Sequence, residues 1–268
     1  MKPDPAKFRG FPHIFWINRT VDAARRSAME HGLAEWELPN TRIEAFDGDG
    51  PLNFIEGAAP NGVPARRLAC YASHLAAHRV FLETDAETAV IMEDDCVFDP
   101  ALYWPFDWRW VEARLPFDLD TLQLVSLNEL QATMRLHRRF MHDYSIAAYL
   151  ITRRHAEKLQ ALLAPNGVAC FEQGFRPELT GEVMIYESGS SWSFPLLLID
   201  ASVEPLLHAE HQDRIFQRNR VRQMKFWTED VKKIVDPERL VAEFGRDWRV
   251  PPELVERVHG LSKPAKKA

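Results

Sequence analysis

The sequence alternates short apolar runs with longer segments in which apolar residues recur at helical spacing, and this alternation limits the folds open to it. The apolar run 14–17 predicts a buried strand, a helix is expected over 21–33, and 41–46 alternates with period two before an Asp-Gly turn. A strand, a helix and a second strand in this order make a βαβ unit, which needs a sheet covered by helices. The chain is therefore predicted to be an α/β protein.

The alternation continues through the middle of the chain. Helices are expected over 66–82 and 153–163, and strands over 89–92, 122–127 and 146–151. The segment 51–65 holds three prolines and two glycines, so a mobile loop is expected there. Together these elements predict one Rossmann-type mixed sheet that is flanked by helices and followed by a C-terminal helical segment.

The strand pattern ends after Pro205, where short helical segments replace it. We expect one sheet-containing domain over 1–207, a helical extension packed on it over 208–262, and a disordered basic tail over 263–268. A chain of 268 residues, of which 46% are hydrophobic, is long enough to bury such a core.

Composition and charge argue against several classes of function. The formal net charge of -6 gives no general attraction to nucleic acid or anionic lipid, so local groups must bind any anionic ligand. No apolar run reaches transmembrane length, and the prolines and charges of residues 1–5 do not fit a secretory signal, so a cytoplasmic protein is expected. Cys70, Cys96 and Cys170 are far apart, which favours reduced, buried thiols over a disulfide framework or a CxxC zinc site.

Three acidic residues, Glu93-Asp94-Asp95, follow the strand predicted over 89–92. Ligands of open α/β sheets bind outside the carboxyl ends of the strands, so acids are well placed for function there. If the strand continued, Glu93 and Asp95 would lie on one side and Asp94 on the other, and two converging carboxylates suit Mg²⁺ or Mn²⁺. The same triplet is also compatible with a solvated turn.

Histidines offer a second kind of ligand. His74 and His78 share one face of the helix predicted over 66–82, but a zinc site needs a third ligand that the sequence does not reveal. His208 and His211 follow a late apolar stretch, and imidazole binds Mn²⁺ as well. Either of these late histidines is also compatible with a structural or surface role.

The helix before the acids carries Cys70-Tyr71-Ala72-Ser73-His74, and this helix followed by a strand ending in Glu-Asp-Asp resembles glycosyltransferase family 25. That family comprises lipooligosaccharide-type galactosyl- and glucosyltransferases related to collagen galactosyltransferases. Further matches are Ile17-Asn18 with Arg25-Arg26, Ala45-Phe46-Asp47-Gly48, Ala148-Tyr149-Leu150-Ile151-Thr152 and Ala156-Glu157-Lys158-Leu159, so the resemblance covers roughly residues 12–163. Two departures are Ala69, where the family usually has glycine, and Arg66-Arg67 in place of its Gly-Glu.

The resemblance implies a GT-A-like fold and a metal-dependent enzyme that transfers a hexose with inversion. The donor is a nucleotide-sugar, most often UDP-linked, and the acceptor is a glycan or glycolipid such as lipopolysaccharide. Mn²⁺ or Mg²⁺ is expected at Glu93, Asp95 and His208, and the nucleotide near Asn18, Asp47, Gly48, Ser73, His74 and Asp94. An inverting displacement needs a general base for the acceptor hydroxyl, and Glu182 is the candidate. The enzyme is expected to use no nucleic acid and to meet the inner face of the membrane through its acceptor.

Other interpretations stay open at this point. The departures at positions 66, 67 and 69 permit a catalytically silent GT-A-like domain that only binds a nucleotide or glycan. A metal-dependent phosphohydrolase would use the same acids, although it requires further His and Asp ligand motifs. The basic segment 218–225, followed by Phe226-Trp227, suits contact with a diphosphate, an anionic lipid or a membrane surface, but equally a solvated helix face.

Overall fold

The computed structural model of the chain describes residues 2–57, 63–126, 134–140, 143–170, 181–199, 214–234 and 236–241. Its centre is a seven-stranded sheet in the order β2-β1-β4-β8-β6-β10-β7. The strands are β1 (Ile14–Asn18), β2 (Asn40–Glu44), β4 (Thr88–Glu93), β6 (Thr121–Gln123), β7 (His137–Arg138), β8 (Ala148–Thr152) and β10 (Ser191–Ser193). Strand β1 pairs in parallel with β2 and β4, whereas β8 runs antiparallel to β4 and β6, so the sheet is mixed.

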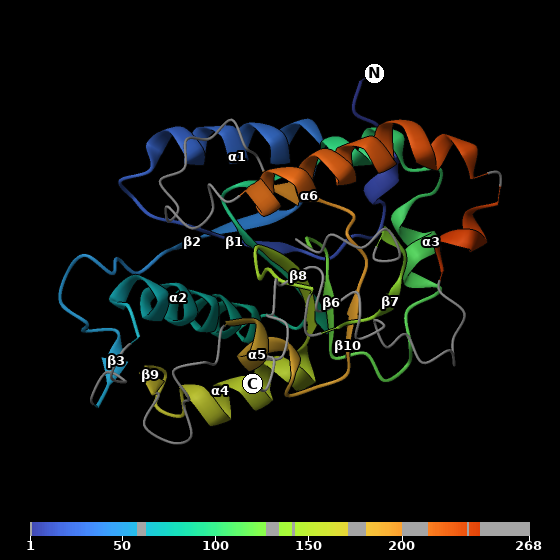
Figure 1. Cartoon of the computed structure of the whole chain (residues 1–268). Coiled ribbons are helices and arrows are strands. Elements are labelled where there is room, and N and C mark those ends of the chain that lie inside the picture. Colours follow the sequence, from blue (N-terminus) through green and yellow to red (C-terminus); the bar gives the residue numbers. More distant parts are fainter. Residues whose placement is uncertain are drawn as a thin grey trace, which may run out of the picture.

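Helices cover both faces of this sheet. Figure 1 shows α1 and α6 on one side, and α2, α4 and α5 on the other. The helices are α1 (Ala23–Glu35), α2 (Ala65–Leu82), α3 (Trp108–Glu112), α4 (Arg153–Leu163), α5 (Gly181–Tyr186) and α6 (Arg214–Lys225). Two small sheets pair β3 (Ile55–Glu56) with β9 (Ala169–Cys170) and β5 (Cys96–Val97) with β11 (Leu198–Ile199).

Strands β1 and β4 are buried on both faces, and their side chains alternate between two hydrophobic clusters. In β1, Ile14 and Trp16 join the cluster on the α1 side, whereas Phe15 and Ile17 join the cluster on the α2 side. Such two-sided burial explains why β1 and β4 appear in the sequence as continuous apolar runs rather than as alternating ones.

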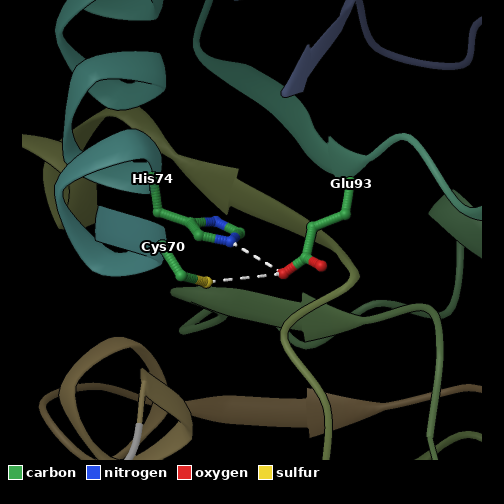
Figure 2. A group of neighbouring side chains, drawn as sticks. All are labelled: Cys70, His74 and Glu93. Carbon is green, nitrogen blue, oxygen red and sulfur yellow. Dashed lines mark hydrogen bonds and ion pairs between the residues drawn. The ribbon is translucent and has the colours of Figure 1, made fainter. Parts of the chain in front are cut away.

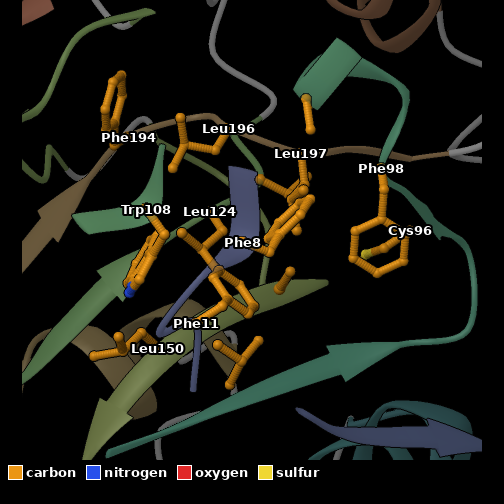
Figure 3. Packing of buried hydrophobic residues seen from close by; sticks show 14 of the residues in the cluster. Phe8, Phe11, Cys96, Phe98, Trp108, Leu124, Leu150, Phe194, Leu196 and Leu197 are labelled. Atoms are coloured by element: carbon orange, nitrogen blue, oxygen red, sulfur yellow. The ribbon is translucent and has the colours of Figure 1, made fainter. Parts of the chain in front are cut away.

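Aromatic side chains dominate the cluster on the α1 side (Figure 3). Phe8, from a short 3₁₀ helix at Pro5–Phe8, lies 5.1 Å from Phe11, and Phe11 lies 4.7 Å from Trp108, both in edge-to-face geometry. Edge-to-face aromatic pairs add about 0.5–1.5 kcal/mol each beyond the burial of their area. The N-terminal segment is therefore fixed to the same core as the sheet.

The segment after α6 also joins this core. It continues as a π-helical turn (Phe226–Asp230) and two 3₁₀ turns (Val231–Lys233 and Pro237–Leu240). Trp227 is fully buried, and its indole N–H donates a hydrogen bond to the carbonyl of Pro195 at 3.1 Å. Trp227, Val231 and Leu240 therefore belong to the hydrophobic cluster on the α1 side, and the basic tail 263–268 lies outside the described residues.

The predicted α/β class, with one mixed sheet, flanking helices and a C-terminal helix, is confirmed. Helix α4 has the predicted bounds, and Thr152 caps it by accepting from the N–H of His155. Strand β6 ends at Gln123, short of the predicted 127, although Leu124 and Val125 stay fully buried. The predicted loop 51–65 contains the two-residue strand β3. Among the described helices, none has the length and apolar character needed to cross a membrane.

Candidate functional site

The carboxyl ends of β1 and β4 lie side by side at one edge of the sheet, because these neighbours are parallel and Ile17 is in register with Glu93. Asn18 ends β1, and its side-chain amide donates to Asp94 Oδ2 at 2.6 Å. Both residues are buried. Two of the residues that were assigned to the nucleotide therefore contact one another at the edge where ligands of α/β sheets bind.

A buried arginine from α1 neutralises part of this acidic site. The Arg25 guanidinium donates to Asp94 Oδ1, and it also lies 3.7 Å from Asp95 Oδ2. Burial still raises the pKa of Asp94 above its usual value, against the opposing effects of Arg25 and Asn18. In the sequence Arg25 appears only within a family match, and no local pattern indicates its contact with Asp94, which lies 69 residues further along the chain.

Asp95 is the least satisfied of the three acids. It is 3% exposed, and its Oδ1 has no hydrogen-bond partner among the described residues. Burial, and then the negative charge of Glu93, raise the pKa of this carboxyl to about 8 although Arg25 opposes the shift. A buried carboxylate oxygen without a donor is unfavourable and is relieved by a cation. This oxygen therefore fits the expected divalent metal.

The Glu93 side chain contacts α2. One carboxylate oxygen lies 3.2 Å from His74 Nε2 and accepts a 3.7 Å contact from the Cys70 thiol (Figure 2). Burial by itself raises the pKa of Glu93, but the hydrogen bond and charge of His74, and the charge of Arg25, hold it below its usual value. Cys70 and His74 are four residues apart on α2, so both side chains lie on the helix face that meets the end of β4.

This arrangement corrects the predicted grouping of the acids. Alternation would have placed Glu93 and Asp95 together and Asp94 apart, but β4 ends at Glu93 and the chain turns at the next two residues. Asp94 and Asp95 therefore share Arg25, whereas Glu93 joins Cys70 and His74. Glu93 stays close enough for its charge to act on Asp95.

The candidate base Glu182 belongs to the first turn of α5. Its Oε1 accepts a hydrogen bond from the backbone N–H of Ser145 at 3.1 Å. Its negative charge contributes to the raised pKa of Cys70 and of Tyr71, after burial in both cases and after Glu93 in the case of Cys70. A methyl group on the preceding Gly181 would come within 2.5 Å of the Tyr71 ring, so α5 begins directly against α2. Glu182 thus lies near the Cys70 side of the site.

The loop after β2 has a structural role beside the site. Ser73 Oγ accepts from the N–H of Phe46 at 2.9 Å and donates to the carbonyl of Ala69 at 2.7 Å. A Cβ on Gly48 would lie 2.3 Å from the Cα of Arg66, so only glycine allows this approach to the start of α2. Asp47 is half exposed and lies 3.8 Å from Arg19. Ser73 and Gly48 hold the loop, whereas Asp47 is open to a ligand.

The other residues named from the sequence either have a different partner or lie outside the described residues. His78 does not complete a metal site with His74, because its Nε2 contacts the hydroxyl of Tyr149 at 2.8 Å. His208, His211 and residues 58–62 of the predicted loop lie outside the described residues.

The chain has weak similarity to several solved structures, with which it shares little sequence. A glycosyltransferase involved in the glycosylation of the major capsid of PBCV-1 is 8% identical, with a TM-score of 0.44 over 79% of this chain and 98% of that one. A197 from STIV is 13% identical, with a TM-score of 0.38 over 70% of this chain and 83% of that one. HddC from Yersinia pseudotuberculosis is 12% identical, with a TM-score of 0.32 over 70% of this chain and 71% of that one. No curated protein matches the sequence.

The sequence itself matches a known protein family over part of its length. Residues 11–104 match the family model described as "Glycosyltransferase family 25 (LPS biosynthesis protein)". The matched segment includes Asn18, Arg25, His74 and the three acids at 93–95, which are the residues brought together at the carboxyl ends of β1 and β4. The resemblance to glycosyltransferase family 25 is thereby confirmed over residues 11–104.

Proposed function

We propose that the protein transfers a hexose from a UDP-linked sugar to a saccharide acceptor, with inversion at the transferred carbon. The observation that carries this proposal is the family match over the segment that holds the buried acids at the sheet edge. The family supports a glycosyl transfer role, and the description of the family as an LPS biosynthesis protein suggests a lipopolysaccharide or lipooligosaccharide acceptor. Contact with the cytoplasmic membrane surface would then come through the acceptor.

Asp95 and Glu93 are the groups best suited to hold a divalent cation on the donor side. Asp95 offers a carboxylate oxygen that has no hydrogen-bond partner in the described part of the chain, whereas both oxygens of Asp94 already accept hydrogen bonds from Asn18 and Arg25. A bound Mn²⁺ or Mg²⁺ would stabilise the negative charge that the leaving diphosphate gains. Asn18 and Arg25 would fix Asp94 and thereby the turn that carries Asp95, while Asp47 is exposed for the nucleotide.

Glu182 is proposed as the general base. As the acceptor oxygen forms its bond to the sugar carbon, the hydroxyl proton passes to the Glu182 carboxylate, and the electron pair of the broken sugar–phosphate bond leaves with UDP. The Ser145 N–H occupies only Oε1 of Glu182, so this hydrogen bond orients the carboxylate and leaves Oε2 for the acceptor.

A silent binding domain is the alternative favoured by two departures from the family pattern, Ala69 and Arg66-Arg67. In the structure Ala69 is buried, and Arg66 is paired with Asp49 at 2.6 Å rather than with an acidic neighbour in its own helix turn. These contacts are compatible with an intact α2, so the departures do not disrupt the helix that carries Cys70 and His74.

A turnover assay separates the two functions. The full chain is incubated with UDP-glucose or UDP-galactose and truncated lipooligosaccharide acceptors, with Mn²⁺ or with a chelator, and both UDP release and the glycosylated product are measured. Acceptor-dependent product that requires the metal supports transfer. Binding of UDP without any product from either donor would favour the silent domain, and release of phosphate would favour a phosphohydrolase.

A further inference from the structure

We propose that Cys70, His74 and Glu93 form a binding site for a borderline-soft divalent cation of the Zn²⁺ type. This site shares Glu93 with the proposed donor site, but the inference does not depend on glycosyl transfer. The three ligand atoms, a thiol sulfur, an imidazole nitrogen and a carboxylate oxygen, all lie within 4.8 Å of one another (Figure 2).

Two of the three separations match the edges of a tetrahedral zinc site. With Zn–N and Zn–O bonds of about 2.0–2.1 Å and a Zn–S bond of about 2.3 Å, tetrahedral angles place N and O about 3.3 Å apart and S and O about 3.6 Å apart. The observed distances are 3.2 Å from His74 Nε2 to Glu93 Oε1 and 3.7 Å from Cys70 Sγ to the same oxygen. The third separation, between Cys70 Sγ and His74 Nε2, is no longer than 4.8 Å, and a fourth position would remain for water.

Rigid elements hold the three donors. Cys70 and His74 come from successive turns of the 18-residue helix α2, and Glu93 is the last residue of the central strand β4. His74 is buried, whereas Cys70 and Glu93 are half-buried. The ligands are thus positioned by the core of the protein while the site keeps contact with solvent, as entry of a metal requires.

Tyr149 orients the His74 imidazole through the nitrogen that does not contact Glu93. Its hydroxyl lies 3.0 Å from His74 Nδ1 and 2.8 Å from His78 Nε2. When His74 Nδ1–H donates to Tyr149, the hydroxyl donates in turn to His78, and the lone pair of His74 Nε2 faces Glu93 and Cys70. Histidines that ligate metals commonly donate their second N–H to such a partner, which fixes the tautomer.

The electrostatic surroundings favour a cation. Glu93 and Glu182 both act on the Cys70 thiol with negative charge. A bound Zn²⁺ would offset this charge, and the thiol proton would be released to solvent as the Zn–S bond forms. Because sulfur and imidazole ligands select zinc-like ions over Mg²⁺, whose ligands are oxygens, the site is expected to discriminate between these metals.

Cobalt spectroscopy tests the site directly, since a Co²⁺–thiolate bond gives a charge-transfer absorption that oxygen and nitrogen ligands do not give. The full chain is freed of metal with a chelator and titrated with Co²⁺. We expect the thiolate band to appear, to vanish on addition of equimolar Zn²⁺ and to persist in excess Mg²⁺. Cys70→Ser should abolish the band, whereas Cys170→Ser, which alters a thiol on the separate β3–β9 sheet, should leave it unchanged.

Two further variants identify the other groups. Glu93→Gln should weaken Zn²⁺ binding, and Tyr149→Phe should weaken it by about 10–100-fold, as is typical when a partner of a ligating histidine is lost. Circular dichroism confirms that each variant is folded. A wild-type titration without a thiolate band, or a band that survives in folded Cys70→Ser, would overturn the inference. Either result leaves the UDP-sugar assay unaffected, so the two proposals fail separately.

Discussion

Replacing Asp95 by asparagine should stabilise the metal-free protein while it weakens metal-dependent donor binding. Asp95 is 3% exposed, and the pKa of its carboxyl is about 8 in the folded protein against an ordinary value of 3.8. Because the folded pKa is raised, the folded state holds its proton more tightly than the unfolded chain does between these two values. The free energy of unfolding therefore falls progressively as the pH rises from about 4 to about 8, because the unfolded chain loses the Asp95 proton while the folded protein keeps it.

The magnitude follows from the width of this pH window. At pH 7 the free energy of unfolding is lowered by roughly 3 pH units times 1.36 kcal/mol, which is about 4 kcal/mol. Asparagine has nearly the same shape but does not ionise, so Asp95→Asn removes this penalty. The stability difference between variant and wild type should grow by about 1.4 kcal/mol per pH unit from pH 5 to pH 8 and level off above that.

Urea denaturation in chelator at several pH values measures this difference. Asp99→Asn is the matched control, since Asp99 is an exposed acid in the same segment and its replacement should change stability by less than about 0.5 kcal/mol. In calorimetric titrations with Mn²⁺, Asp95→Asn should bind UDP more weakly than wild type. A stability difference that did not vary with pH would refute the burial argument, and unchanged Mn²⁺-dependent UDP affinity would refute the ligand role.

Three further predictions concern the base, the loop and a glycine. Glu182→Gln keeps the oxygen that accepts a hydrogen bond from Ser145 but removes the basic carboxylate. Turnover should therefore fall by about 10²–10⁴-fold while the affinity for UDP stays near the wild-type value. Wild-type turnover in this variant would exclude Glu182 as the base. Backbone amides of 51–65 should gain protection from hydrogen exchange when UDP and Mn²⁺ bind, and unchanged exchange would argue against a lid. Gly48→Ala should lower the free energy of unfolding by about 1–3 kcal/mol in denaturation experiments, because the Cβ of the alanine would collide with the backbone of Arg66. An unchanged free energy of unfolding would contradict this contact.

The sequence predicted the elements near the site well, because their signals are local. Helix α4 has a capping threonine before it and a Pro-Asn-Gly turn after it, and β1 and β4 are apolar runs that end in polar residues. The prediction for strand β6 extends too far, to residue 127, because Leu124 and Val125 remain buried after the strand pairing ends at Gln123. Burial alone therefore does not mark where a strand stops.

The sequence did not predict which side chains of the site contact one another. Period-two alternation predicted a Glu93–Asp95 pair, but it holds only while the strand lasts, and the turn after Glu93 places Asp94 and Asp95 together at Arg25. The sequence reveals no third ligand for a zinc site at His74 and His78, because Glu93, which contacts His74, lies 19 residues from it along the chain. Such contacts are set by the packing of α2 on β4, which no local pattern specifies.

The central claim is that the acids at the carboxyl ends of β1 and β4 bind the donor through a metal, and a crystal structure with UDP and Mn²⁺ tests it most directly. Anomalous scattering locates manganese independently of any assumed ligand set. We expect the ion on the Asp95 carboxylate, with Glu93 nearby and the UDP phosphates on the far side of the metal. Manganese and diphosphate bound away from Asp95 and Glu93 would contradict the account.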